Sequence, residues 1–244
     1  MGNLTRPNSP WVLIPAYNAA STVFKVVADV CALGLPVLVV DDGSTDETAM
    51  RAEAAGAKVL RHAENRGKGA AIQTGFAFAR RLGLKALLTM DADGQHDVAE
   101  VGRLLRASAD HPEGLVIGVR SFDPAVMPKR SRIGNRISTY WISLFAKRAH
   151  QDSQSGFRVY PRRLFALPLR TRRFDTETEL LLWAAKLGVP LIEVPIATIY
   201  PGEHSSHFRN WEDTLRVLRL VIGSPLWRVD REAGAMPQKM TEAL

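Results

Sequence analysis

Two aspartates separated by one residue are the first feature of this 244-residue chain that could do chemistry. Asp91 and Asp93 follow residues 86–90, an apolar run with the character of a buried strand. Two carboxylates so spaced at a strand end can both reach one cation, and oxygen ligands favour Mg²⁺ or Mn²⁺. Gln95 and His96 follow at once and strengthen this interpretation over a solvated loop with a helix cap. The pattern predicts a divalent-metal site beside substrate phosphates.

A glycine-rich segment, residues 65–70, is the second such feature. Gly67 and Gly69 would let the backbone approach a phosphate, and the helix that follows would offer unpaired N–H groups to an anion. Lys68, between the glycines, could supply a positive countercharge. The alternative is a plain turn with a helix cap. The spacing fits neither a P-loop nor a dinucleotide fingerprint, so a P-loop ATPase and a dinucleotide oxidoreductase are not supported.

Short apolar runs alternate with amphipathic stretches over the first two-thirds of the chain, which is typical of a parallel sheet with helices on both faces. The expected strands cover residues 11–14, ended by Pro15, then 37–40, 58–60, 86–90 and 115–119. The expected helices cover residues 22–33 and 67–82. Two more are expected after Ser44, which forms a capping box with Glu47, and after Asp97, which caps the helix together with Glu100.

Polar clusters follow three of these strands, at residues 15–18, 41–42 and 91–93. Ligands of parallel sheets bind outside the carboxyl ends of the strands, so we expect one site there. Further along, helices are expected over residues 131–147, 177–187 and 211–221, and an extended stretch over residues 191–200, broken at Pro195. The prediction is a single α/β domain over residues 10–222, with tails at 1–9 and 223–244.

Four segments together resemble the family 2 glycosyltransferases of the GT-A fold: residues 14–18, 40–46, 65–69 and 91–93. The match in order and spacing extends over residues 12–219. Within the family, the chain is most similar to the dolichyl- and polyprenyl-phosphate sugar synthases, on residues 91–96, 118–120, 155–158 and 193–196. The resemblance implies a Rossmann-like, mostly parallel sheet. It also implies metal-dependent, inverting transfer of a sugar from a nucleotide diphosphate-sugar to a polyprenyl-phosphate-like lipid.

The resemblance also implies roles for particular residues. Those expected to contact the donor are Pro15, Tyr17 and Asp42, joined by Asn18, Lys68 and Asp91. Those expected to hold Mg²⁺ or Mn²⁺ with the donor diphosphate are Asp91, Asp93 and Gln95. Those expected near the acceptor phosphate are Arg120, one of Arg130 or Arg132, and also Ser206 and His207.

One segment departs from these synthases, which carry Arg-x-x-Gly-x-Ser-Lys shortly after the extended stretch. Here residues 201–207 keep Ser206, but Pro201 stands in place of the Arg and His207 in place of the Lys. An imidazole, often neutral at pH 7, holds phosphate more weakly than an ammonium does. This departure favours the alternative of a hydroxyl acceptor, either soluble or on a non-prenyl lipid.

The expected chemistry is a single in-line displacement at the anomeric carbon, with Asp93 and Arg120 as catalytic residues. A phosphate acceptor is already anionic, whereas a hydroxyl acceptor needs a carboxylate base. Asp175, Glu177 and Glu179 are the candidate bases, with helix capping as the competing role for the glutamates. Arg158 is either a site residue or a structural partner beneath the site.

The net charge is +7, and residues 120–173 hold 13 Lys or Arg against two acids. Such a surplus indicates either a solvated basic face or a partner that carries phosphate, such as a phosphorylated substrate or an anionic membrane surface. Nucleic acid fits less well, because no nucleic-acid-binding motif is present. The helix over residues 131–147 would either lie at the membrane interface or pack in the core.

The sequence also bears on the cellular location of the protein and on more distant functions. With the single Cys31 no disulfide framework is possible. Neither a signal peptide nor an apolar run of about 18 residues is found, so we expect a cytoplasmic protein with peripheral contact to the inner membrane face. More distant functions are a sugar-nucleotide-forming nucleotidyltransferase and a donor-binding subunit without turnover. Both UDP and GDP donors are compatible with the sequence.

Overall fold

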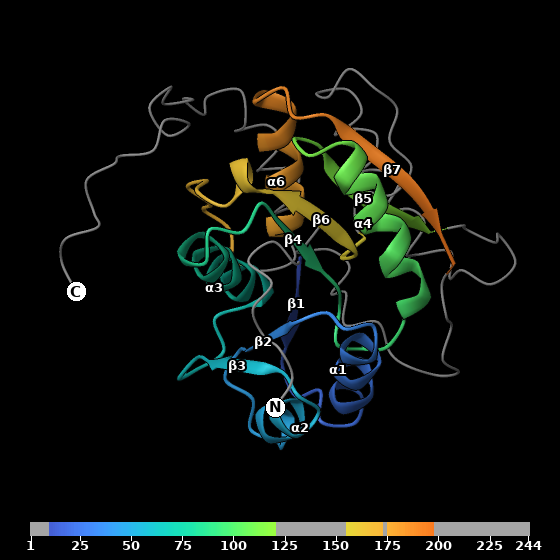
Figure 1. The fold of residues 1–244 in the computed structure, drawn as a ribbon. Helices are drawn as coiled ribbons and strands as arrows, with labels where there is room; N and C mark the ends of the chain where they lie inside the picture. The colour runs from blue at the N-terminus through green and yellow to red at the C-terminus, as the bar shows by residue number, and fades with distance from the viewer. Residues whose placement is uncertain (1–9, 121–154, 173–174, 198–244) are drawn as a thin grey trace, which may run out of the picture.

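The computed structural model describes residues 10–120, 155–172 and 175–197 of the chain. They form a seven-stranded sheet in the order β3-β2-β1-β4-β6-β5-β7 (Figure 1). Every neighbouring pair is parallel except those of β6, which runs antiparallel to both β4 and β5. The predicted mostly parallel α/β architecture is therefore confirmed.

The strands and helices lie close to the predicted ranges. The strands are β1 (Trp11–Ala16), β2 (Val37–Asp41), β3 (Lys58–Arg61), β4 (Ala86–Thr89), β5 (Leu115–Arg120), β6 (Arg158–Pro161) and β7 (Leu191–Ile196). The helices are α1 (Val23–Ala32), α2 (Thr48–Ala54), α3 (Lys68–Arg81), α4 (Val101–Asp110) and α6 (Asp175–Lys186), with short 3-10 turns at η1 (Val98–Glu100) and η2 (Arg162–Leu164).

Two apolar layers cover the two faces of the sheet. Alternate side chains of a strand point to opposite faces, so Leu13 of β1 joins α3 and α6 in one layer. Val12 and Ile14 join α1, α2 and α4 in the other. Helices therefore cover both faces, and the carboxyl ends of β1, β2 and β4 are left to carry polar loops.

Strand β1 continues past Pro15, where the sequence predicted its end. Pro15 pairs with Val40 of β2, whereas the pairing of β1 with β4 stops at Leu13. Beyond Leu13 one side of β1 is unpaired, and proline is tolerated in a strand where its missing N–H is not needed. Pro195 is likewise inside β7, which is an edge strand, so the expected break there is wrong as well.

The predicted capping box of Ser44 and Glu47 is wrong. Helix α2 begins at Thr48, and its N-cap residue Glu47 makes no side-chain capping bond. Asp46 accepts a hydrogen bond from the Thr48 amide at 3.0 Å instead, and Glu47 pairs with Arg51. Ser44 is used elsewhere, because its hydroxyl accepts a bond from the Asn18 amide.

Asp97 caps the next helical segment as predicted, since its carboxylate accepts a bond from the Ala99 amide. Glu100 does not complete a capping box there; it pairs with Arg103. Several expectations lie outside the described residues, namely the tails at 1–9 and 223–244, the helices over 131–147 and 211–221, and the side chains of Arg130, Arg132, Ser206 and His207. Within the described ranges, no helix combines the length and apolar character needed to cross a bilayer.

Candidate active site

Three charged side chains from three separate elements meet at the carboxyl end of β4. Asp91 lies in the loop after β4, Lys68 is the first residue of α3, and Glu177 lies in the first turn of α6. The Lys68 ammonium is 2.6 Å from Asp91 Oδ1 and 2.9 Å from Glu177 Oε1. The imidazole of His96 lies 3.5 Å from the other Asp91 oxygen. The sequence predicted neither the Lys68–Asp91 nor the Lys68–Glu177 contact.

The charged groups of this cluster stabilise one another in their ionised forms. Burial alone would lower the pKa of Lys68, but the Asp91 and Glu177 carboxylates raise it well above its ordinary value. Burial alone would raise the pKa of Asp91, but the Lys68 ammonium and then His96 hold it far below its usual range. Both partners are therefore ionised at neutral pH, and the Lys68 side chain is only 17% exposed.

Asp93 reaches the protein surface beside this cluster. Its carboxylate accepts a hydrogen bond from the Gln95 amide at 2.9 Å. Partial removal from water, and then the negative charge of Asp91, raise the pKa of Asp93. Two carboxylates thus lie close enough to repel each other, and a shared cation would relieve that repulsion.

The predicted metal ligands fit a hard divalent cation on these grounds. Among the residues the structure describes, no group of three or more His, Cys, Asp or Glu is arranged to hold a metal by itself. Mg²⁺ is commonly held by one or two carboxylates, with substrate phosphates and waters completing its shell. Asp91 and Asp93 supply that number, and the Gln95 side chain lies next to them in the chain.

The floor of the site is built by the segment before β6. A Cβ added to Gly156 would lie 2.6 Å from Asp91 Oδ2 and 2.9 Å from Lys68 Nζ, so only glycine fits against the ion pair. Arg158 is fully buried and donates to the carbonyl oxygens of Ser155 and Glu177 at 2.6 and 2.9 Å. These contacts fit the role of a structural partner beneath the site, one of the two roles considered from the sequence.

Asp42, expected to contact the nucleoside, is engaged inside the protein. It is 3% exposed, and its carboxylate accepts bonds from the amides of Arg66 and Gly67 at 3.0 and 2.6 Å. His62 Nδ1 lies 2.7 Å from the same carboxylate, and His62 Nε2 lies 2.9 Å from the Thr74 hydroxyl. Asp42 thus holds the glycine-rich loop through two amides that lie just before α3. A nucleoside contact of Asp42 stays a prediction.

The loop after β1 presents the other predicted donor residues. Tyr17 is 48% exposed, so its ring is accessible for stacking on a base. Asn18 has a left-handed backbone, with φ of 49°, and its side-chain oxygen accepts a bond from the Thr45 amide. Pro15 lies within β1, next to β2. The loops after β1 and β2 are therefore tied together.

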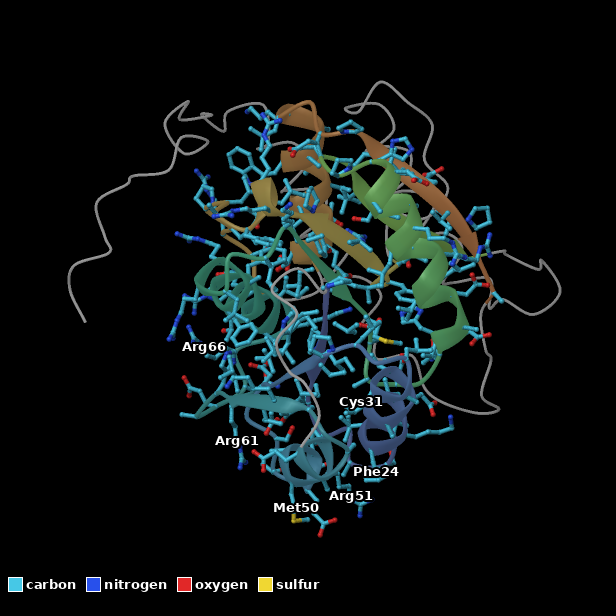
Figure 2. All side chains as sticks on the ribbon, viewed as in Figure 1. Phe24, Cys31, Met50, Arg51, Arg61 and Arg66 are labelled. Carbon is cyan, nitrogen blue, oxygen red and sulfur yellow. The ribbon has the colours of Figure 1, made fainter. Side chains whose placement is uncertain are left out.

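Arg61 adds a cation that the sequence did not single out. Its Nε lies 3.1 Å from the buried Asp41 carboxylate, and one terminal nitrogen donates to the Ser44 carbonyl oxygen. Figure 2 shows Arg61 and Arg66 on the same side of the molecule, one at the end of β3 and the other in the loop before α3. Their positive charge lies beside the glycine-rich loop.

Glu179 is separate from the cluster around Asp91. It is fully buried, and its carboxylate accepts bonds from the amides of Arg170 and Thr171 and from the Thr171 hydroxyl, at 3.0, 2.9 and 2.6 Å.

Arg120 is the last residue of β5, paired with Ile196 of β7. Of the predicted residues, the structure thus brings together Lys68, Asp91 and Glu177, with Asp93 beside them.

Two residues of the site, Gly156 and His62, were not singled out from the sequence, although Gly156 lies within the segment 155–158 that carries the resemblance. Gly156 is important because it lies against Asp91 and Lys68. The sequence around a single glycine does not show which residues it contacts in the fold. His62 links Asp42 to Thr74 of α3, and a histidine after a short strand is not distinctive.

Comparison with known proteins places these observations in a family. Residues 11–166 match the model of the family described as glycosyl transferase family 2. A dolichyl-phosphate beta-glucosyltransferase of Drosophila melanogaster is 30% identical, over 89% of this chain and 76% of its own. A UDP-N-acetylglucosamine–dolichyl-phosphate N-acetylglucosaminyltransferase of Methanococcus voltae is 29% identical, over 78% and 85% of the two chains.

A solved structure shares the fold. It is glucosyl-3-phosphoglycerate synthase of Mycobacterium tuberculosis in complex with Mn²⁺, UDP and glucosyl-3-phosphoglycerate. The TM-score is 0.69 at 18% identity, over 95% of this chain and 82% of the other. At that identity the likeness concerns the GT-A fold alone.

Proposed function

Because the chain belongs to glycosyl transferase family 2, we propose that it moves a sugar from a nucleoside diphosphate onto the phosphate of a polyprenyl-phosphate-like lipid. Glycosyl transfer follows from the family, and the acceptor is our proposal. Two relatives that this chain matches over at least three quarters of their own length are named for a dolichyl-phosphate acceptor. The reaction would take place at the cytoplasmic face of a membrane.

The state of Glu177 and Glu179, two of the three candidate bases in α6, is the observation that carries this choice of acceptor. A hydroxyl acceptor needs a carboxylate within reach to remove its proton. Glu179 is fully buried with its oxygens occupied by Arg170 and Thr171. Glu177 is 5% exposed, and its Oε1 lies 2.9 Å from the Lys68 ammonium, so this carboxylate is engaged as well. A phosphate acceptor is already anionic and needs no base.

The reaction would be a single displacement with inversion. An oxygen of the acceptor phosphate forms a bond to the anomeric carbon, while the bond from that carbon to the donor diphosphate breaks. The electron pair leaves with the diphosphate oxygen, and no proton has to be moved. Tyr17 would bind the nucleoside, and Arg120 would bind the acceptor phosphate.

Asp91 and Asp93, with Gln95, would hold Mg²⁺ or Mn²⁺ beside the donor diphosphate. A divalent ion there neutralises the charge that grows on the departing nucleotide. The chain's own contribution is to keep Asp91 ionised and oriented, through Lys68 and His96.

A hydroxyl acceptor is the second candidate. Pro201 and His207 favour it, because they replace the two cations that the resembling synthases carry there. Asp175, half-buried in the first turn of α6, is the acid that would then take the proton.

A matched pair of lipids separates the two candidates. The full-length protein is incubated with Mn²⁺ and a panel of radiolabelled UDP- and GDP-sugars, with either a polyprenyl phosphate or the corresponding polyprenol. We expect a labelled lipid product from the phosphate and none from the alcohol, because only the phosphate reacts without a base. A product from the alcohol, or from soluble hydroxyl acceptors while the lipid phosphate stays unlabelled, would reject the proposal.

A further inference from the structure

Lys68 joins two carboxylates that are far apart in the sequence. Asp91 follows β4, and Glu177 belongs to α6. The ammonium lies 2.6 Å from one and 2.9 Å from the other, so it is shared between them. Lysine carries a compact point charge with three donors, which suits it to bridge two separate acceptors.

The surroundings leave this ion pair little freedom. The side chains of Lys68 and Glu177 are 17% and 7% exposed. Gly156 packs directly against both Lys68 Nζ and the Asp91 carboxylate. A buried ion pair gains little stability over apolar residues of similar size, because removing both charges from water is costly. Stability alone therefore does not account for burying these charges together, whereas a role in the reaction would.

Two roles for Lys68 make different demands on its geometry. As a countercharge for the donor diphosphate, which the sequence suggested, its ammonium should point to the place of the phosphates. In the structure the ammonium instead contacts Asp91 Oδ1, an oxygen of a predicted metal ligand. A cation that approaches Asp91 must share that carboxylate with Lys68.

We propose that Lys68 is a positioning residue that acts on Asp91: its ammonium holds the Asp91 carboxylate before the donor arrives and competes with the divalent cation for it. The proposal rests on the proposed function, in which Asp91 helps to hold that cation. Glu177 has a defined part in it, because its carboxylate shares the ammonium and so weakens the hold of Lys68 on Asp91. Lys68 thus makes cation binding by the free protein weaker than the carboxylates of Asp91 and Asp93 alone would allow.

The test measures Mn²⁺ binding by the full-length protein without nucleotide, from the loss of the free-Mn²⁺ electron paramagnetic resonance signal. Lys68→Met removes the competing charge at similar length. Its Kd for Mn²⁺ should fall by about tenfold, since a unit charge at such short range is worth at least that factor. Glu177→Gln removes one of the two negative charges that share the ammonium and so strengthens its hold on Asp91, so the Kd for Mn²⁺ should rise by a few-fold. Asp91→Asn is the control that removes the shared ligand and should weaken Mn²⁺ binding strongly.

The opposite pattern would overturn the proposal. If Lys68→Met leaves the Kd for Mn²⁺ unchanged and instead weakens binding of UDP or GDP measured without metal, Lys68 is a phosphate countercharge. Circular dichroism checks that each variant is folded, and Glu177→Gln tests the idea independently should Lys68→Met not fold. A wild-type protein that binds no Mn²⁺ would also overturn it. The lipid-acceptor assay uses the unaltered protein and makes no assumption about Lys68. Failure of the Mn²⁺-binding prediction is therefore distinguishable from failure of the proposed lipid-phosphate acceptor.

Discussion

Gly156 lies against two charged groups that occupy the space in which any other residue would place its Cβ. The nearest atoms to such a Cβ are Asp91 Oδ2 at 2.6 Å, Asp91 Oδ1 at 2.9 Å and Lys68 Nζ at 2.9 Å. Distances this short require the neighbouring atoms to move. The backbone of Gly156 has little room to yield, because its carbonyl oxygen accepts a bond from the buried Thr89 hydroxyl.

Gly156→Ala should therefore displace the Asp91 carboxylate and lower the rate of sugar transfer by roughly tenfold or more, since small misplacements at a reacting centre are costly. The measurement is kcat with saturating donor, together with the thermal midpoint of unfolding.

Gly102→Ala is the matched control. Gly102 lies inside α4, and the nearest atom to its added Cβ is the flexible Arg106 Nη1 at 3.5 Å. That change should leave the rate unaltered and raise the free energy of unfolding by about 0.5–1 kcal/mol. A Gly156→Ala variant as active as Gly102→Ala would show that the fit against Asp91 is unimportant.

At the scale of elements, the glycine-rich loop before α3 is held by Asp42 at the end of β2. One carboxylate accepts bonds from two loop amides and contacts His62, which in turn contacts Thr74 of α3. The position of the loop, and with it the start of α3 where Lys68 stands, thus depends on the strand beside it.

Asp42→Ala should lower the free energy of unfolding by about 3 kcal/mol, because it leaves buried donors without an acceptor. Urea denaturation of the full chain measures this. Asp97→Ala, which removes an ordinary capping carboxylate at η1, is the control and should cost about 1 kcal/mol. If Asp42→Ala is as stable as the control but no longer binds a nucleoside diphosphate, Asp42 contacts the ligand, as the resemblance implied.

Sequence reasoning succeeded for elements whose signal is local. The apolar run of β2 and the periodicity of α1 each fixed an element within a residue or two. The capping box at Ser44 failed because the Ser44 hydroxyl is taken by the Asn18 amide, 26 residues away. Pro15 failed to end β1 because the ladder to β4 had already stopped.

The same reasoning explains what could be predicted of the site. Asp91 and Asp93 were found because two acids after a strand form a local pattern, and the topology brings strand ends together. The roles of Lys68 and Glu177 depend on a contact between α3 and α6, which are about a hundred residues apart. No pattern along the chain reports such a contact, so both residues were named but their mutual pairing was not.

At the scale of the whole molecule, the alternation of strands and helices was enough to predict a mostly parallel sheet covered on both faces. The sequence predicted the start of a strand at residues 155–160, where β6 lies, but not its antiparallel direction or its place between β4 and β5, because a four-residue strand carries no sign of its direction. This strand has a consequence for the site, since the residues just before it supply Gly156 beneath Asp91.

The charge of the molecule bears on where the reaction takes place. Residues 120–173 hold 13 of the 32 Lys and Arg of the chain but only two of its 25 acids. A lipid-phosphate acceptor lies in a membrane, and a basic surface is attracted to anionic lipid by roughly 1 kcal/mol per Lys or Arg near it.

The full-length protein should therefore sediment with vesicles that contain phosphatidylserine or phosphatidylglycerol, and remain in solution with purely zwitterionic vesicles. Raising the salt from about 0.1 to 1 M shortens the screening length from about 10 to 3 Å, so it should release the bound protein. Binding that is equal for both vesicle types and insensitive to salt would point to an apolar contact in place of the basic segment, and background sedimentation with anionic vesicles would rule out peripheral attachment.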